Sequence, residues 1–527
     1  MGTSTAPTVS RTRRGATRRR PAAAGGLASA IVTTYIARFA SLVAYVALLP
    51  VVLTAFGAES YGLYVLTVAV GSLFQQDLGI GGATTRFIGV AVPSHDVTRM
   101  RSIASASTVF FVIAAFLLAG ATAAAFALVV PNARFDDDLT PTAWALCVLG
   151  VVNVFLTLVF ASNRQILAGV GRLNDVNYLL IGVAVFRILV TVGVCWADLG
   201  IVAVAIVDVT AILGFGVATY VLRRLRAPEI SARPRDFRWR VFRELFGVSS
   251  QLMVLDIAGV VIMQVGGILT ALLMPIAFAA LYAAAQRIYL LVKEVTGSLA
   301  TAVLPTASMR EGGATGTPVA ELYVRGTTFA NMLMTIVLVP TLVFMPAIMT
   351  AWLGPEGAAA AIVAQILLIS MFANNNHLLA VPILVAQGSV RGYAVLHVIW
   401  AVTGTALAAV LGTMLGLPGI AVGLTLPVLL LEPLYVLIAL RRLGLRARDF
   451  AVRCLLLPFG TVAPLAVLLY LAGLFDPPLP LIPVFAAVWA VCAGAVYYFL
   501  ALDAGGREIL RASVSARSRS RHVEEAP

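Results

Sequence analysis

Residues 27–54, LASAIVTTYIARFASLVAYVALLPVVLT, decide the fold of this chain. The run is 28 residues long and contains a single charged side chain, Arg38. An α-helix needs about 20 apolar residues to cross the roughly 30 Å hydrocarbon core of a bilayer, so this run is long enough to span a membrane. It is too long for the apolar region of a signal peptide. We therefore expect a retained first transmembrane helix.

Thirteen further apolar runs of similar length follow. The chain of 527 residues is 60% hydrophobic and only 12% charged, whereas soluble domains contain roughly 25% charged residues. Most of its surface must therefore face lipid. The runs lie at 60–83, 102–130, 142–162, 176–197, 199–222, 245–271, 276–305, 322–348, 359–386, 393–415, 418–439, 453–473 and 479–501. The sequence thus predicts an all-α polytopic membrane protein with about fourteen transmembrane helices.

The distribution of arginine predicts the orientation. If both termini are cytoplasmic, nearly all loop and tail arginines fall on the cytoplasmic side, and the other side receives only Arg134, beside Asp136, Asp137 and Asp138. This asymmetry is typical of cytoplasmic loops. It also accounts for the net charge of +13 without a nucleic-acid partner. The arginine-rich tails are either disordered cytoplasmic anchors or ligands for anionic lipid headgroups.

The chain repeats itself after about 218 residues. Leu63-Tyr64 recurs as Leu281-Tyr282, and Gly79 as Gly297, both at an offset of 218 that matches six spans. An even number of spans gives both copies the same orientation, as in transporters built from two lobes around a cleft. The predicted segments are a basic cytoplasmic tail (1–26), an N-terminal six-helix lobe (27–222), a basic cytoplasmic linker (223–244), a C-terminal six-helix lobe (245–440), a cytoplasmic loop (441–452), two additional helices (453–501) and a cytoplasmic tail (502–527).

Four cationic residues lie inside predicted spans: Arg38, Arg187, Arg287 and Lys293. A central Arg or Lys costs about 2.5–3.5 kcal/mol on insertion scales, so these side chains must face protein or water. The same spans contain acidic residues, among which Asp77, Asp256 and Glu294 are candidate counter-charges or ion-coupling groups. Asp256 is the repeat equivalent of Arg38, and the two are predicted to face each other. Simple ion pairing and a substrate path are both open interpretations.

The cations favour an anionic ligand, because the arginine fork matches the oxygens of phosphate. Asn374, Asn375 and His377, in the run Asn374-Asn375-Asn376-His377 of the tenth span, are candidate contacts to sugar hydroxyls. Interhelical hydrogen bonding is the alternative for this run. The four cysteines and four histidines show no metal-binding spacing, and no phosphate-binding loop is present. We therefore expect no metal, no cofactor and no ATPase activity.

Residues 56–64, FGAESYGLY, followed by Asp77-Leu78-Gly79-Ile80 and Thr85-Arg86, resemble the start of the polysaccharide flippases of the multidrug/oligosaccharidyl-lipid/polysaccharide exporter superfamily. The resemblance implies a multi-pass protein of the bacterial cytoplasmic membrane. Its substrate would be an undecaprenyl-diphosphate-linked oligosaccharide, moved to the outer leaflet by alternating access for cell-surface polysaccharide synthesis. Arginines in the cleft would receive the diphosphate; membrane lipids and polysaccharide-assembly proteins would be its partners. Arg38, Arg187 and Arg287 are assigned by depth, not by motif.

Two other functions are open. A drug or metabolite antiporter of the same superfamily would need only twelve spans and an acidic cavity. A membrane glycosyltransferase or polysaccharide polymerase would carry a large outer loop with catalytic carboxylates, whereas the longest outer loop here is 131–141 and Asp136 to Asp138 are interpreted as solvated. We therefore expect a transporter and not an enzyme. The membrane potential, or protons or sodium acting through Asp256 or Glu294, would supply the energy.

Overall fold

The computed structural model describes residues 23–311, 319–386, 390–502 and 507, and within them the chain is helical, with no strand beyond one isolated bridge. Twelve stretches of the described residues are long and apolar enough to cross a membrane. The prediction of an all-α polytopic membrane protein is therefore confirmed, while the count of fourteen spans stays a prediction. The two predicted tails lie almost entirely outside the described residues.

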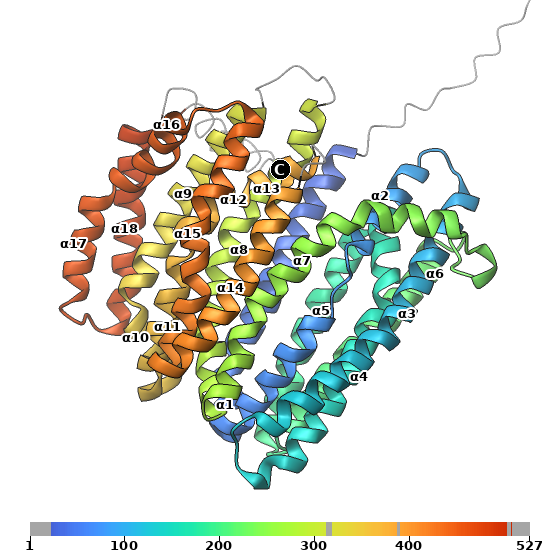
Figure 1. The fold of residues 1–527 in the computed structure, drawn as a ribbon, viewed down its shortest axis with the longest axis horizontal. Coiled ribbons are helices and arrows are strands. Elements are labelled where there is room, and N and C mark those ends of the chain that lie inside the picture. Colours follow the sequence, from blue (N-terminus) through green and yellow to red (C-terminus); the bar gives the residue numbers. More distant parts are fainter. Residues whose placement is uncertain (1–22, 312–318, 387–389, 503–506, 508–527) are drawn as a thin grey trace, which may run out of the picture.

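The first lobe contains six helices, drawn in blue to green in Figure 1. Its helices are α1 (Ala23–Phe74), α2 (Ile80–Ala91), α3 (Val97–Val129), α4 (Thr140–Gly169), α5 (Leu173–Trp196) and α6 (Ile201–Arg226). Helix α1 bends at Gly57, whose φ of 79° and ψ of 165° are not helical. Glycine adopts a positive φ without the steric cost that a Cβ brings. Its two halves therefore run in different directions.

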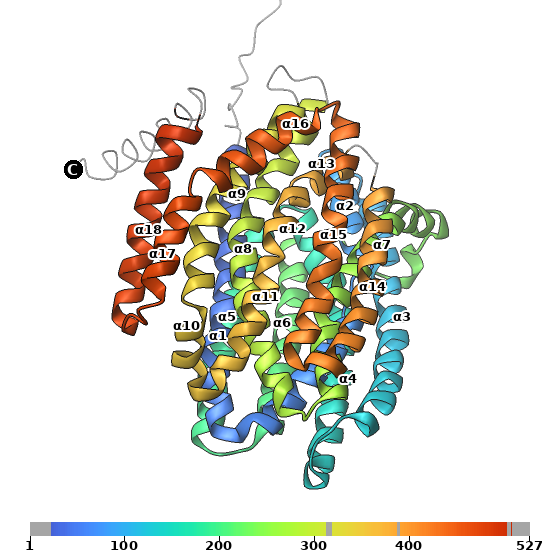
Figure 2. The same cartoon turned by 60° about the vertical axis from the view of Figure 1, so that its left-hand side comes forward.

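The second lobe combines long helices with several short ones. Its helices are α8 (Ala277–Glu311), α9 (Val319–Val343), α10 (Met345–Leu353), α11 (Gly357–Ile369), α12 (Met371–Leu378), α13 (Ala380–Ala386), α14 (Arg391–Leu415) and α15 (Leu417–Leu443). The remaining helices pack along α9 at the outer edge (Figure 2). They are α16 (Ala447–Phe450), a π-helical stretch (Ala451–Gly460), α17 (Ala463–Gly473) and α18 (Ile482–Val496) with a final π-helical turn (Tyr497–Ala501).

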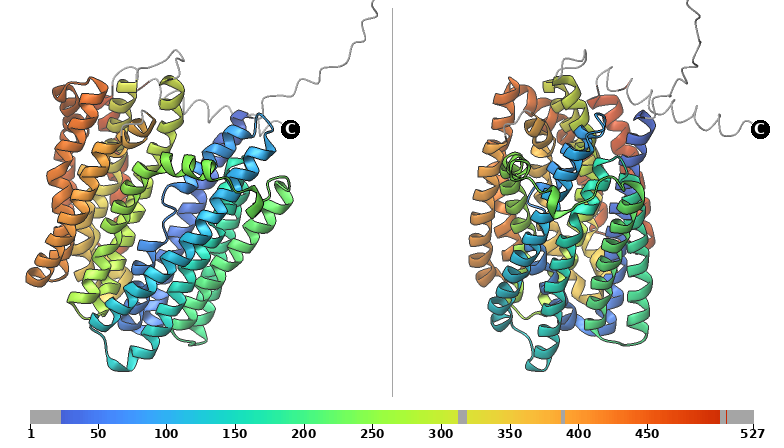
Figure 3. Two further views of the ribbon diagram at one scale, coloured as in Figure 1. Left: turned by 45° about the vertical axis from the view of Figure 1, so that its right-hand side comes forward. Right: turned by 90° about the vertical axis from the view of Figure 1, so that its right-hand side faces the viewer.

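Helix α7 (Trp239–Leu273) connects the lobes. It contacts α2 and α3 of the first lobe and α14 and α15 of the second, and it crosses between them in Figure 3. The lobes converge near the bend of α1 and diverge toward the side on which α1 begins (Figure 1). Helix α18 and its final turn end on that same side (Figure 2). The two lobes thus meet at one end of the molecule and splay apart at the other (Figure 1).

Backbone contacts close the converging end. Ile276, in the turn between α7 and α8, donates its backbone N–H to the carbonyl of Arg134 at 2.8 Å. Gly62 packs so closely on the carbonyl of Ile276 that a Cβ at this position would overlap its oxygen. The two lobes can therefore approach this closely because residue 62 has no side chain.

We expect Gly62→Ala to separate the lobes at this end. The added methyl meets backbone atoms, which cannot rotate away, and overpacking of this kind costs about 1–3 kcal/mol. The thermal unfolding midpoint of the purified protein should fall relative to that of Gly120→Ala, because a Cβ at Gly120 meets nothing within 4 Å. Equal midpoints for the two variants would show that the contact with Ile276 is not tight.

Candidate functional site

Two of the predicted cations meet at one aromatic ring. The guanidinium carbon of Arg187, from α5, lies 4.4 Å from the centroid of the Tyr45 ring, and that of Arg287, from α8, lies 4.5 Å from it. Arginine is attracted to the electron-rich face of such a ring. Tyr45 belongs to α1, so residues of both lobes build this arrangement. It forms a cationic site at the boundary between the lobes.

Arg187 is held by a carboxylate and by a hydroxyl. It forms an ion pair with Asp208 of α6 and donates a hydrogen bond to the Tyr45 hydroxyl, and Tyr64 donates its own hydroxyl hydrogen to Asp208. The side chains of Arg187 and Asp208 are only 20% and 11% exposed. The pair is thus largely shielded from water, and both side chains have hydrogen-bonding partners. In contrast, Arg287 forms no ion pair within the described residues, so the site keeps a net positive charge.

A polar chamber in the first lobe adjoins this site. A cavity of about 170 Å³ is lined by Tyr45, Arg187, Asp208, Gln75 and Asn153 together with apolar side chains. Gln75 donates to Asn153 at 2.6 Å. Gln75 also lines a neighbouring cavity of about 390 Å³. The two cavities therefore adjoin each other at Gln75, within the first lobe.

The larger cavity contains Asp77, one of the predicted counter-charges, and Arg164. The sequence places Arg164 just beyond an apolar run, but the helix extends to Gly169 and carries the side chain into the cavity wall. Arg164 lies within electrostatic range of Asp77 and Arg38. It is a functional candidate that sequence reasoning missed, because charged residues at the end of a span are usually loop residues.

Arg38 joins the lobes through an ion pair with Glu294. Its guanidinium nitrogen lies 3.3 Å from Glu294 Oε1, with 56% of the Arg38 side chain exposed. Asp256, on α7, is exposed and forms no ion pair among the described residues, although it lies within electrostatic range of Asp77. Lys293 lies over the ring of Tyr289, 5.8 Å from its centroid. The counter-charge of Arg38 is therefore Glu294.

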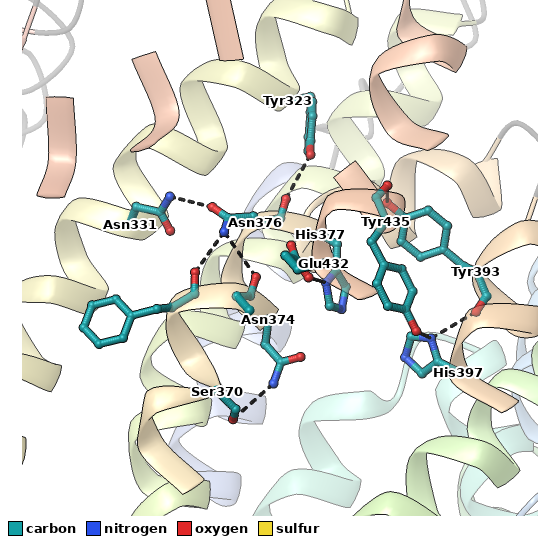
Figure 4. A network of polar contacts seen from close by, with 12 residues as sticks. Tyr323, Asn331, Ser370, Asn374, Asn376, His377, Tyr393, His397, Glu432 and Tyr435 are labelled. Carbon is teal, nitrogen blue, oxygen red and sulfur yellow. Dashed lines mark hydrogen bonds and ion pairs between the residues drawn. The ribbon is translucent and has the colours of Figure 1, made fainter. Parts of the chain in front are cut away.

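The asparagine run belongs to a different cluster, inside the second lobe (Figure 4). Asn375 donates to Asn331 at 2.8 Å, and Asn374 donates to Ser370 at 3.4 Å. His377 Nδ1 lies 2.6 Å from Glu432 Oε2. Within the described residues no contact joins this cluster to Tyr45, and the buried contacts of Asn375 and His377 are of the interhelical kind. Their role as sugar contacts stays a prediction.

Comparison with known proteins shows which solved structures have a similar fold. No protein-family model and no curated protein sequence matches the chain. Among solved structures, an inward-facing multidrug resistance MATE family transporter of the MOP superfamily is 16% identical, with a TM-score of 0.64, over 79% of this chain and 98% of that one. The lipid II flippase MurJ, in an inward closed conformation, is 14% identical, with a TM-score of 0.66, over 89% and 98% of the two chains.

A third similar structure is a MOP superfamily transporter from Pyrococcus furiosus, described as having a binding pocket of reverse polarity. It is 15% identical, with a TM-score of 0.58, over 80% of this chain and 95% of that one. At such identities the likeness concerns the fold alone. Together with the two lobes described above, it shows that this chain has the fold shared by MATE transporters and MurJ in the MOP superfamily.

Proposed function

We propose that the protein is a flippase that moves an undecaprenyl-diphosphate-linked oligosaccharide from the cytoplasmic to the outer leaflet of the bacterial cytoplasmic membrane. The observation that carries this proposal is the placement of Arg187 and Arg287, from opposite lobes, against the ring of Tyr45. Because Asp208 offsets Arg187 alone, the site attracts an anion. A diphosphate has two negatively charged groups and can contact both lobes at once.

The geometry supports alternating access. In the described arrangement the lobes touch at the end formed by Gly62 and Ile276 and diverge at the other end. A diphosphate bound between Arg187 and Arg287 would bridge the lobes, and the lipid tail would stay in the bilayer. Rocking the lobes would then carry the site to the other side. Moving two negative charges outward across an inside-negative membrane is favourable by about 4–5 kcal/mol per 100 mV.

A drug or metabolite antiporter is the second candidate, and one observation favours it. Asp208 lines the 170 Å³ cavity of the first lobe together with Tyr64 and Gln75. A carboxylate in such a chamber can bind an organic cation. Against this, the carboxylate of Asp208 already contacts Arg187 and Tyr64. A cationic substrate would have to replace the guanidinium of Arg187.

A proteoliposome experiment separates the two candidates. We expect the purified protein to bring a fluorescently labelled undecaprenyl-diphosphate disaccharide to the opposite leaflet, measured as the fraction of label that a membrane-impermeant quencher reaches. Vesicles without protein should keep the label in one leaflet. Accumulation of an organic cation such as ethidium, with the labelled lipid unmoved, would favour the antiporter and contradict the flippase.

A further inference from the structure

The second lobe contains an ionisable pair that the proposed substrate site does not use. His377 of α12 and Glu432 of α15 are buried, with 7% and 9% of their side chains exposed, and His377 Nδ1 lies 2.6 Å from Glu432 Oε2 (Figure 4). The shortness of this contact is typical of a hydrogen bond to a charged group. The imidazole and the carboxylate therefore form a buried hydrogen bond within the lobe.

The second oxygen of the carboxylate is also buried. Glu432 Oε1 is buried and has no hydrogen-bond partner among the described residues. A buried carboxylate oxygen without a partner costs free energy, whereas a proton on it removes the charge. When His377 is neutral and Glu432 ionised, the pair has a net charge of −1. One proton arriving at Glu432 Oε1 or at His377 Nε2 makes the pair neutral.

A less buried histidine, His397, lies beside this pair. The ring of Tyr435 stacks on that of His377, with centroids 4.4 Å apart and planes 19° apart. The Tyr435 hydroxyl lies 2.8 Å from Nδ1 of His397, a half-buried residue of α14. The imidazole of His397 also lies close to that of His377, with ring centroids 6.0 Å apart. Two imidazoles and a phenol thus lie together beside Glu432, and His397 is the least buried of the three.

We propose that His377 and Glu432 form a proton-binding site that couples transport to a proton gradient. This inference rests on the proposed flippase function. The pair takes up one proton from the outer side of the membrane in one arrangement of the lobes. It releases that proton to the cytoplasmic side in the other arrangement, in exchange for the outward movement of the lipid-linked anion.

Helix α8 provides a physical connection between the proton site and the lobe boundary. It packs against α12, which carries His377, and it contains Lys293. The next residue, Glu294, forms the ion pair with Arg38 of the first lobe. A change of charge at His377 and Glu432 therefore occurs next to the helix that carries an ion pair between the two lobes. This placement gives a bound proton the means to change the relative stability of the two lobe arrangements.

The surroundings hold further groups that can change charge or donate protons. Helices α11 and α13, which pack against α12, carry no titratable side chain. The groups on the other elements packed around the pair include Lys293 on α8, Tyr323 on α9, Tyr393 and His397 on α14, Tyr435 on α15, Asp256 on α7 and Cys454 on the π-helical stretch. Among these, Tyr435 and His397 are in hydrogen-bonding contact with each other and adjacent to the pair.

Infrared spectroscopy on the full-length protein tests proton binding directly. We expect the wild type to gain a protonated-carboxyl band as the pH is lowered, with one component that Glu432→Gln removes. The matched control is Glu356→Gln, whose parent carboxylate is exposed in the turn between α10 and α11. The Glu356→Gln variant should keep the component of the band that Glu432→Gln removes. Persistence of the full band in Glu432→Gln would overturn the proposal, whether or not the protein moves the lipid.

Transport measurements test the coupling. In proteoliposomes, an imposed gradient of about one pH unit should shift the final leaflet distribution of the labelled undecaprenyl-diphosphate disaccharide by up to about tenfold for one coupled proton. Glu432→Gln and His377→Gln should lose this shift while still equilibrating the lipid. A shift retained by both variants, or produced by a sodium gradient alone, would overturn the coupling role. A wild type that never moves the lipid would refute the flippase function, and the infrared result would then decide the proton site.

Discussion

Replacing Arg287 with glutamine is expected to nearly abolish movement of the lipid-linked anion while leaving the fold intact. Arg287 contacts Tyr45 but forms no ion pair within the described residues, so its removal strands no buried carboxylate. A hydrogen bond to a charged group contributes about 1.5–3 kcal/mol, which corresponds to a loss of roughly 10- to 150-fold. The rate of leaflet exchange in proteoliposomes should fall by this factor, and the unfolding midpoint should stay close to that of the wild type.

Two further variants make the result specific. Arg287→Lys keeps the charge but not the planar fork that binds two phosphate oxygens, so it should restore only part of the rate. Arg391→Gln removes an exposed arginine from the start of α14 in the same lobe and should leave the rate unchanged. If Arg287→Gln and Arg391→Gln transport equally well, Arg287 does not contact the substrate.

The depth of the cations could be predicted from the sequence, but their partners could not. The position of a charge within a predicted span gives its depth in the membrane, and a charge at the centre is costly. This is why Arg187 and Arg287 could be chosen as candidates. The partner of a charge depends on how helices rotate and tilt, which apolar runs do not specify. The repeat suggested Asp256 as the partner of Arg38, whereas the helix geometry brings Glu294 to it.

Tyr45 shows a second limit of the sequence. A tyrosine inside an apolar run looks like any core aromatic residue, and only the structure reveals that two guanidinium groups lie against its ring. The apolar run at 359–386 shows a third limit. It is continuous in sequence, but the structure divides it into α11, α12 and α13. His377, on the short middle helix α12, lies beside Glu432 within the second lobe.

Arg187→Gln should destabilise the protein far more than Arg287→Gln. It leaves the carboxylate of Asp208 buried without its cation, and breaking a buried ion pair by removing one partner costs about 3–5 kcal/mol. Asp208→Asn should cost a comparable amount, because it leaves the guanidinium unpaired. The double variant Arg187→Gln/Asp208→Asn removes both charges, so it should recover most of the lost stability. Unfolding midpoints of the four proteins form a double-mutant cycle that measures the coupling.

The same double variant separates the two roles of Arg187. If Arg187 binds the diphosphate, a protein that has regained stability without it should still fail to move the lipid. Tyr64 provides a comparison, because it contacts Asp208 as Arg187 does but carries no positive charge. Tyr64→Phe should therefore preserve transport. Recovery of both stability and transport in the double variant would reduce Arg187 to a counter-ion of Asp208. The anion would then be bound by Arg287 without Arg187. The first lobe would have to supply another cation, for which Arg164 in the adjoining cavity is a candidate.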